Sequence, residues 1–174
     1  MTKKEVDKIL SFGQSHSIPI EGYPIGVTRF QAFLAIREVL KGKLYWYALR
    51  EAYASSDNLY DYRFDVKLAF QSQENQKEFL MTKRERIFLQ HLPDQITIYR
   101  GMTVNELIEK TVGFSWTLKK EIAEFFAYEY TRNFRTNNLE KTVHEMTINK
   151  SEVMGFFNGR EEFEIVYFHK PQEK

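Results

Sequence analysis

Near its C-terminus the chain reads Glu162-Phe163-Glu164-Ile165-Val166-Tyr167-Phe168, with two carboxylates spaced two residues apart in a run of residues that favour β-strands. The run predicts a strand over residues 162–168, and on a strand residues two apart point to the same side. Glu162 and Glu164 would then share a face with Val166 and Phe168. Paired carboxylates at one end of an apolar strand face suit the stabilisation of a cation-like sugar transition state or the transfer of protons. The run therefore predicts both a strand and a candidate catalytic site.

The rest of the second half shows strand and short-helix patterns. Pro93-Asp94 signals a turn, and the alternating residues 95–100, which Gly101 ends, predict a strand. Thr103-Val104-Asn105-Glu106 has the spacing of a capping box and predicts a short helix. The other elements expected here are a strand over residues 112–116, a helix over 119–134 and a strand over 142–148.

The first half of the chain has helical patterns. Thr28-Arg29-Phe30-Gln31 is a capping box that opens a helix with a broad apolar stripe, and Gly42 is expected to end that helix. Further helices are expected over residues 44–54 and 60–70, and from a second capping box, Thr82-Lys83-Arg84-Glu85, to about residue 92. Residues 1–25 are expected to be irregular because they contain Pro19, Gly22, Pro24 and Gly26.

A helical first half and a strand-rich second half predict the α+β class. The length of 174 residues suits one domain with a substantial core. We therefore expect a single domain over residues 1–174, with a mainly helical part over 1–92, a strand-rich part over 93–168 and a tail over 169–174.

Composition narrows the function classes. The 25 basic and 24 acidic residues leave a net charge of +1, which argues against a dedicated nucleic-acid-binding module. The chain has no cysteine, and its four histidines lack metal-ligand spacing, so neither a disulfide framework nor a metal site is expected. No run approaches the roughly 20 apolar residues of a membrane span, so a cytoplasmic protein without membrane partners is expected.

Three motifs follow one another along the second half: Tyr99-Arg100-Gly101, then Gly113-Phe114-Ser115-Trp116-Thr117 before a helix that carries Ala123 and Phe126-Ala127, then Glu162-Phe163-Glu164. In this order, over roughly residues 95–168, they resemble the mono-ADP-ribosyltransferases of the Arg-Ser-Glu class. The resemblance implies a split β-sandwich of the ADP-ribosyltransferase type, packed against the helical N-terminal half. It also implies an enzyme that uses NAD+ as co-substrate.

The resemblance also implies roles for individual residues. Arg100 would contact the phosphates of NAD+, for which its planar donor fork is suited, and Gly101 would allow close approach of the ligand. Ser115 would hold the carboxylate of Glu164, which would bind the 2′-hydroxyl of the nicotinamide ribose and stabilise the positive charge of the transition state. Glu162 would orient or deprotonate the acceptor, and in relatives a glutamate at its position accompanies side-chain nitrogen acceptors, often arginine.

Several residues of these motifs have two interpretations. Thr117 supports the Ser115 network or caps the following helix. Phe114, Trp116 and Phe126 stack on nicotinamide or pack in the core. Trp116 is also a departure, since many relatives have Ser-Thr-Ser where this chain has Ser-Trp-Thr. In the segment over residues 155–160, Phe156 and Phe157 recognise the acceptor or fill the core beneath the loop.

The leading hypothesis is therefore transfer of ADP-ribose from NAD+ to a macromolecular acceptor, a protein rather than a nucleic acid. Many small relatives act in this way in bacterial or phage conflict. An NAD+ glycohydrolase, which uses water as acceptor, and a non-catalytic binding domain of the same fold are the alternatives. Both NAD+ hypotheses require Arg100, Ser115 and Glu164 to line one cleft. The sequence names neither the acceptor nor the oligomeric state.

Overall fold

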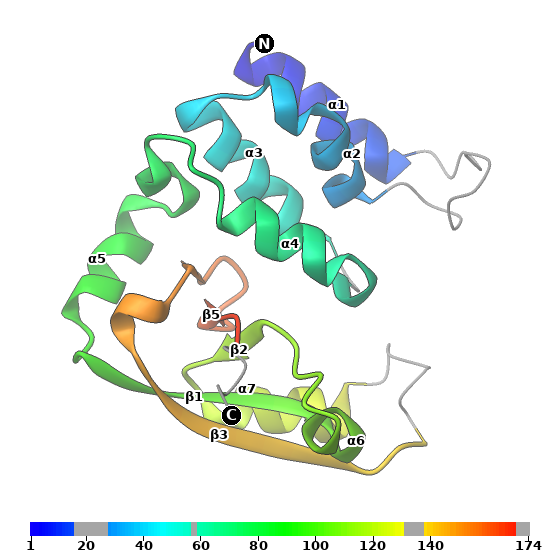
Figure 1. Cartoon of the computed structure of the whole chain (residues 1–174), viewed down its shortest axis with the longest axis vertical. Helices are drawn as coiled ribbons and strands as arrows, with labels where there is room; N and C mark the ends of the chain where they lie inside the picture. The colour runs from blue at the N-terminus through cyan, green and yellow to red at the C-terminus, as the bar shows by residue number, and fades with distance from the viewer. Residues whose placement is uncertain (16–27, 57–58, 131–137, 170–174) are drawn as a thin grey trace. The chain divides into compact units, whose positions relative to one another are not determined.

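The computed structural model describes residues 1–15, 28–56, 59–130 and 138–169 (Figure 1). The chain divides into two compact units, Met1–Thr82 and Lys83–Lys174. The regular elements described in the first unit are helices, and those of the second include a five-stranded sheet. The α+β class is thus confirmed, whereas the single domain stays a prediction.

The first unit contains four α-helices and three short 3₁₀ turns among its described residues. These are α1 (Lys3–Ser15), α2 (Arg29–Ile36), η1 (Arg37–Val39), α3 (Gly42–Ala54), η2 (Leu59–Tyr62), α4 (Arg63–Phe70) and η3 (Lys77–Leu80). The capping box at Thr28 is confirmed: its hydroxyl accepts from the Gln31 N–H, and the Gln31 side chain accepts from the Thr28 N–H.

The expectation that residues 1–25 are irregular is wrong for Lys3–Ser15, which form helix α1. The overlooked signal is a fourth capping box, Thr2-Lys3-Lys4-Glu5. The Thr2 N–H donates to Glu5 Oε2 at 2.7 Å, and the Glu5 N–H donates to Thr2 Oγ1 at 3.4 Å. Pro19, Gly22, Pro24 and Gly26, on which the expectation was based, lie outside the described residues.

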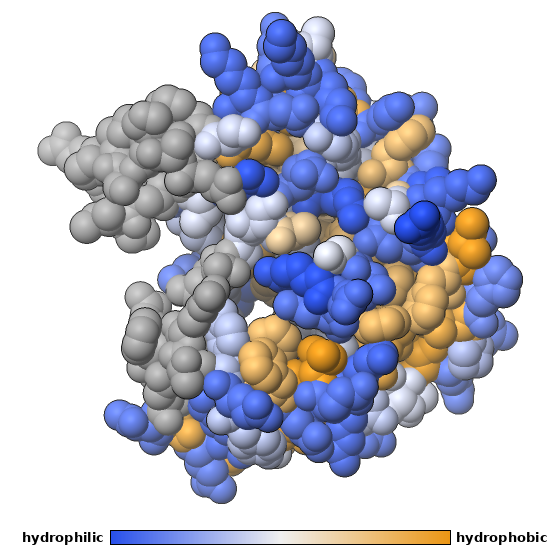
Figure 2. Space-filling view, turned by 180° about the vertical axis from the view of Figure 1, so that it is seen from behind, coloured by the Kyte–Doolittle hydropathy of each residue, from blue (hydrophilic) through white to orange (hydrophobic). Residues whose placement is uncertain are grey.

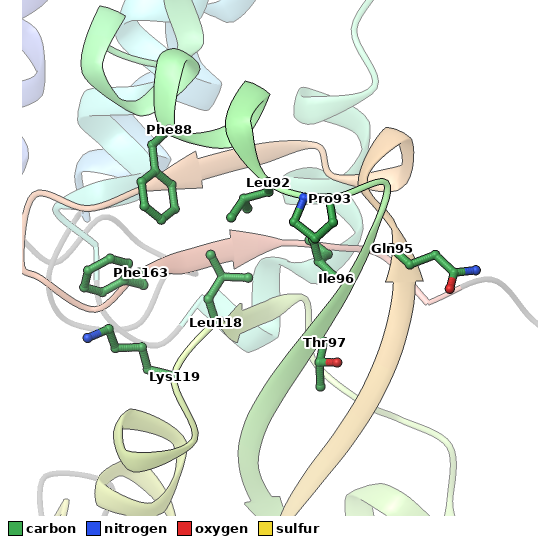
Figure 3. Close-up of a pocket in the computed structure, with 9 residues that line it drawn as sticks. All are labelled: Phe88, Leu92, Pro93, Gln95, Ile96, Thr97, Leu118, Lys119 and Phe163. Atoms are coloured by element: carbon green, nitrogen blue, oxygen red, sulfur yellow. The ribbon is translucent and has the colours of Figure 1, made fainter.

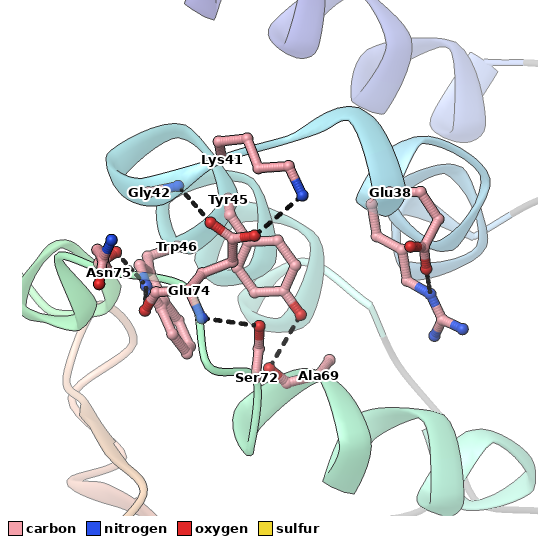
Figure 4. Close-up of polar contacts among 10 residues, drawn as sticks. Glu38, Lys41, Gly42, Tyr45, Trp46, Ala69, Ser72, Glu74 and Asn75 are labelled. Carbon is pink, nitrogen blue, oxygen red and sulfur yellow. Dashed lines mark hydrogen bonds and ion pairs between the residues drawn. The ribbon is translucent and has the colours of Figure 1, made fainter.

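Gly42 also differs from its predicted role, because it begins α3 instead of ending the preceding helix. Its φ of +49° is a conformation that glycine adopts readily, and an added Cβ would lie 2.8 Å from Gln76 Oε1. The loop before η3 caps α3 at this point (Figure 4). The Gly42 N–H donates to Glu74 Oε2 at 2.9 Å, and the Lys43 N–H donates to Gln76 Oε1 at 3.0 Å. Two orphan donors of the helix start are thereby satisfied from a distant part of the sequence.

Aromatic rings form much of the core of the first unit. Tyr45 meets Phe33 and Trp46 edge to face, with ring centroids 5.4 and 5.1 Å apart. The polar ends of both Tyr45 and Trp46 are satisfied by backbone carbonyls. The Tyr45 hydroxyl donates to Ala69 O at 3.0 Å, and the Trp46 indole donates to Asn75 O at 2.9 Å (Figure 4). The same loop that caps α3 is therefore held onto the core.

The second unit begins with the predicted helix and continues into the sheet. Its elements are α5 (Lys83–His91), β1 (Gln95–Thr103), α6 (Val104–Ile108), β2 (Ser115–Thr117), α7 (Lys120–Glu124), η4 (Phe125–Glu129), β3 (Lys141–Asn149), η5 (Lys150–Glu152), β4 (Gly155–Phe157) and β5 (Glu164–Val166). The strand order is β3-β1-β2-β5-β4, and each paired neighbour is antiparallel.

Several predicted boundaries in this unit are corrected. Strand β1 runs on to Thr103, so Arg100 lies inside a strand and not at its end. The predicted strand over residues 162–168 is β5, which begins only at Glu164 because Phe163 has a φ of +49°. The predicted helix over 119–134 is α7 followed by the π-helical turn η4, and its end falls outside the described residues. The capping box at Thr103 is confirmed.

The sheet has one narrow join. Strands β1 and β3 pair along nine positions, whereas β1 and β2 pair at a single position, Tyr99 opposite Thr117. Strands β2, β5 and β4 pair along their three-residue lengths. The sheet is thus a long two-stranded ribbon joined at one point to a short three-stranded part.

The surface carries both polar and apolar residues. On the face shown in Figure 2, polar residues cover most of the visible area, with apolar patches between them. Exposed large apolar side chains include Phe64, Leu68, Ile108 and Tyr128. None of the helices in the described ranges combines the length and apolar character that crossing a membrane requires.

The loop cap of α3 yields a pH prediction. Hydrogen bonds from the Gly42 N–H and from Lys41 hold the pKa of Glu74 below its ordinary 4.5. In the window just below pH 4.5 the unfolded chain therefore binds more protons than the folded one, so stability falls as pH drops through the folded pKa. Glu74→Gln should destabilise the first unit at pH 7 and flatten its loss of stability in acid.

The measurement is urea unfolding at pH 7 and pH 4, followed by Trp46 fluorescence in a Trp116→Phe background, because each unit carries one of the two tryptophans. Glu38→Gln is the matched control, since the Glu38 side chain is 85% exposed. If the free energy of unfolding fell by the same amount between pH 7 and pH 4 in Glu74→Gln and in the parent, the proposed cap by Glu74 would be contradicted.

Candidate functional site

Ser115 and Glu164 meet at the centre of the sheet. They lie on the paired strands β2 and β5, where Thr117 is opposite Glu164 and Ser115 is opposite Val166. The Ser115 hydroxyl donates to Glu164 Oε1 at 2.6 Å. The carboxylate of Glu164 belongs to a residue that is only 9% exposed, and a buried carboxylate requires such donors. The structure thus brings together the two residues that the sequence proposed as partners.

Arg100 reaches the same serine from β1. Its Nη1 donates to the backbone carbonyl of Ser115 at 2.6 Å. The guanidinium lies over Gly113, where an added Cβ would come within 2.4 Å of Nη2 and 2.7 Å of Cζ. Ser115 therefore links both partners, accepting from Arg100 through its carbonyl and donating to Glu164 through its hydroxyl.

The position of Arg100 explains the narrow join in the sheet. In the antiparallel register set by Tyr99 and Thr117, the following pairs would be Arg100 with Trp116 and Gly101 with Ser115, but the two strands pair only at Tyr99 and Thr117. The Ser115 carbonyl accepts from the Arg100 guanidinium at this point. The Arg100 side chain thus takes the place of a backbone hydrogen bond between β1 and β2. The β1–β3 ribbon and the part formed by β2, β5 and β4 do not pair beyond this point.

Gly101 makes a close contact of a different kind from the one predicted. An added Cβ would lie 2.3 Å from Ala123 O and 2.7 Å from Ala127 N, both in the helical segment formed by α7 and η4. The glycine therefore allows the helix backbone to approach the strand. Ala123 and Ala127, which the sequence analysis named on the helix after the second motif, are buried in this contact.

Glu162 lies in the turn that leads into β5, so the prediction that it shares a strand face with Glu164 is wrong. Glu161 and Phe163 both have left-handed φ values, +60° and +49°. The Thr117 hydroxyl donates to the Glu162 carbonyl at 2.7 Å and accepts from the Lys119 N–H at 3.1 Å. Thr117 therefore anchors the turn through one hydrogen bond and Lys119, the N-cap residue of α7, through the other.

Two residues that the sequence analysis missed organise this turn. Asn158 accepts from the Phe163 N–H through Oδ1 at 3.1 Å, and from the Glu161 N–H through its carbonyl at 3.2 Å. Its own N–H donates to Glu85 Oε1 at 2.9 Å, and Glu85 is buried. Asn158-Gly159 is a turn dipeptide that could have identified the first residue. For Glu85, the sequence analysis predicted only a role in the capping box that begins at Thr82.

The aromatic residues divide between core and surface. Trp116 is 2% exposed, its indole donates to Gly113 O at 3.1 Å and its ring lies 5.8 Å from His144, which favours the core interpretation. Phe156 and Phe157 are buried in β4, which favours the second of their two interpretations, filling of the core, over acceptor recognition. Phe114 contacts the ring of Phe168, with centroids 5.7 Å apart.

Phe126 lies on the π-helical turn η4 and is 36% exposed. Its ring meets those of Phe125 and Tyr130, with centroids 5.5 and 5.2 Å away. Phe126 thus keeps an accessible ring face.

His144 is opposite Arg100 in the β1–β3 ribbon. Burial, together with the nearby charge of His169, lowers the pKa of His144. Within the described ranges, no group of three or more acidic or histidine side chains gathers as a metal site would require.

A cavity of about 440 Å³ lies beside the turn (Figure 3). Phe88, Leu118 and Phe163 point toward it, and the Lys119 ammonium lies 4.4 Å from the centre of the Phe163 ring. The described lining includes Phe163 but not Arg100, Ser115 or Glu164. The cavity therefore adjoins the turn without containing the hydrogen-bonded three.

No protein-family model, curated protein or solved structure matches this chain.

Alanine substitutions at three glycines test the close contacts of Gly101 and Gly113. Gly101→Ala should destabilise the second unit by about 3 kcal/mol, because the new methyl meets helix backbone that cannot rotate away. Gly113→Ala should cost about 1–2 kcal/mol, because it displaces the Arg100 guanidinium from its hydrogen bond.

Gly159→Ala is the control and should change stability by less than about 0.5 kcal/mol, since nothing lies within 4 Å of its added Cβ. Urea unfolding followed by Trp116 fluorescence in a Trp46→Phe background measures all three. Equal effects of the substitutions at Gly113 and Gly159 would refute the contact between Gly113 and Arg100.

Proposed function

We propose that this chain is an NAD+-dependent ADP-ribosyltransferase whose acceptor is a protein. The observation that carries the proposal is the hydrogen-bonded link from Arg100 through Ser115 to Glu164. It joins one residue from each of the three motifs, although Arg100 and Glu164 are more than 60 positions apart in the sequence. The resemblance to the Arg-Ser-Glu class implies such a grouping.

The environment of Glu164 suits the reaction. Its low exposure places the carboxylate where electrostatic interactions are weakly screened, and the Ser115 hydroxyl fixes its orientation in advance. In the proposed reaction the carboxylate binds the 2′-hydroxyl of the nicotinamide ribose. This contact strengthens as the bond between the sugar and nicotinamide breaks and positive charge develops on the sugar.

Arg100 contributes a cation that is bound to the same serine as this carboxylate. A guanidinium that is held by the Ser115 carbonyl and leans on Gly113 has a fixed plane. A planar guanidinium suits the recognition of a pyrophosphate, to which it donates in pairs. The narrow join between β1 and β2 supports a split sheet of the ADP-ribosyltransferase type, with Arg100 at the split.

The partial exposure of the Glu162 side chain supports a role in facing the acceptor. The glutamate is held by Thr117 through its backbone carbonyl, and its side chain is 25% exposed. In the proposed reaction it takes a proton from the acceptor nitrogen or orients that nitrogen toward the sugar.

Release of nicotinamide from NAD+ tests the proposal. Glu164→Gln should lower the rate by about 10²–10³-fold, since it removes a charge aligned with the transition state. Ser115→Ala should lower kcat by up to about 10²-fold, because the carboxylate loses its orientation. Glu145→Gln, at an exposed glutamate of β3, is the matched control and should leave the rate unchanged.

The acceptor requirement separates transfer from hydrolysis. Release that depends on added protein, with label from the adenine half of NAD+ retained on that protein, supports the transferase. Release at the same rate in buffer alone would favour the glycohydrolase. No release, with no NAD+ binding by calorimetry, would leave only a binding domain.

Arg100→Lys provides a separate prediction about binding. The lysine keeps the charge but loses the planar fork, so we expect the KM for NAD+ to rise by about tenfold, equivalent to about 1.4 kcal/mol. Steady-state kinetics measures the change. An unchanged KM would exclude Arg100 from phosphate binding.

A further inference from the structure

The cavity beside the turn before β5 has the composition of a small-molecule site (Figure 3). Its volume of about 440 Å³ falls within the range of about 300–1,000 Å³ that is usual for ligand pockets. Most of its described lining is apolar and consists of Phe88, Leu92, Pro93, Ile96, Leu118 and Phe163. Among the described residues that line it, Lys119 carries the one charge. Apolar walls with a single cation favour an apolar ligand that bears one negative charge.

Two aromatic rings form part of the wall. The Phe88 ring stacks on Phe156 with centroids 4.8 Å apart, and it meets the Phe163 ring edge to face at 5.8 Å. Phe88 is nevertheless 38% exposed, so part of its ring stays accessible to a ligand. Phe88 and Phe163 both point toward the cavity (Figure 3). A planar apolar ligand therefore has an aromatic surface on which to stack.

The backbone around Phe163 holds its ring in place. Phe163 has a φ of +49°, which is rare for a residue with a bulky side chain. Its N–H donates to Asn158 Oδ1 at 3.1 Å, and its carbonyl accepts from the Leu118 N–H at 3.1 Å. Leu118 also lines the cavity, so one hydrogen bond joins two parts of the wall. A wall fixed in this way is preorganised, which lowers the cost of binding a ligand.

Lys119 supplies the charge at the edge of the cavity. Its Nζ lies 4.4 Å from the centre of the Phe163 ring and 3.8 Å from Glu121 Oε1, a separation longer than a hydrogen bond. The side chains of Lys119 and Glu121 are 43% and 68% exposed, so this ion pair is weak. The ammonium can therefore exchange Glu121 for the anionic group of a ligand, while the lysine stem stays on the apolar wall.

We propose that this cavity binds a small apolar carboxylate, whose apolar part packs against Phe88, Leu118 and Phe163 while its carboxylate pairs with Lys119. Binding here is independent of the proposed function, because the described lining does not include the Arg100, Ser115 and Glu164 side chains. The bound molecule touches Leu118 and Phe163 together, so it stabilises the hydrogen bond that joins them.

The first test is an NMR titration of the whole chain at pH 7 with 2-naphthoate, and with 2-naphthamide as its neutral analogue. A Kd of about 1 mM or lower is expected for 2-naphthoate, as is usual for a compound of this size. The amide should bind about three- to fivefold more weakly, because it carries no charge for Lys119 to pair with. Equal affinities for the two compounds, or no binding of either at about 5 mM, would overturn the proposal.

Neighbouring lysines provide a matched pair of variants. Lys120 is exposed and lies outside the described lining. Lys119→Gln should weaken the binding of 2-naphthoate about three- to fivefold and leave that of 2-naphthamide unchanged, whereas Lys120→Gln should change neither. Phe88→Leu should weaken both compounds by about threefold or more, since the stacking ring is lost. Affinities that equal those of the parent in all three variants would place the compound on another apolar surface and refute the site.

Hydrogen exchange of the Leu118 N–H gives a readout that is specific to the cavity. At a 2-naphthoate concentration of about five times Kd, this exchange should slow by about sixfold, because opening of the hydrogen bond requires release of the ligand. Exchange of the Gly42 N–H, which belongs to the first unit, should not change. An unchanged rate at Leu118 would contradict binding between Leu118 and Phe163.

A second copy of the chain is the competing occupant, and sedimentation velocity distinguishes it. A monomer that shows the binding pattern above supports the small-molecule site. A dimer that Phe88→Leu dissociates would assign the cavity to self-association and overturn the proposal.

Discussion

The hydrogen bond from Ser115 to Glu164 is the contact on which the site depends. A carboxylate in the middle of a sheet requires a donor, and the serine supplies one from the neighbouring strand. The carbonyl of the same serine accepts from Arg100, so one residue fixes both a buried anion and a cation. Because Arg100 stands between β1 and β2, this network also shapes the sheet, which narrows to a single paired position there.

Small residues around this network have a common physical role. Gly113 makes room for the Arg100 guanidinium, and Gly101 makes room for the backbone of the helix that carries Ala123 and Ala127. Both glycines have φ values outside the left-handed region, so space and not backbone conformation is what they provide. These glycines therefore let the strand that carries Arg100 pack closely against neighbouring backbone and side chains. The polar side chains of Arg100, Ser115 and Glu164 are hydrogen-bonded within this packed region.

Both units fix a turn by polar contacts from remote sequence. In the first, Glu74 and Gln76 bind the N–H groups at the start of α3, and Trp46 holds the same loop through its indole (Figure 4). In the second, Asn158, Glu85 and Thr117 hold the turn before β5. Such turns tolerate left-handed residues such as Gln76 and Phe163 because several hydrogen bonds determine the backbone together.

The sequence by itself determined the α+β class, most of the element order, the capping boxes at Thr28 and Thr103, and the partnership of Ser115 with Glu164. These features depend on local spacing or on motifs. It missed α1, although Thr2 and Glu5 were in capping positions, and it gave Gly42 the wrong helix. Only the tertiary structure decided the position of Glu162, the burial of Phe156 and Phe157, the insertion of Arg100 between strands and the roles of Asn158 and Glu85. Each of these depends on which distant groups meet, and the periodicity of a sequence carries no record of such contacts.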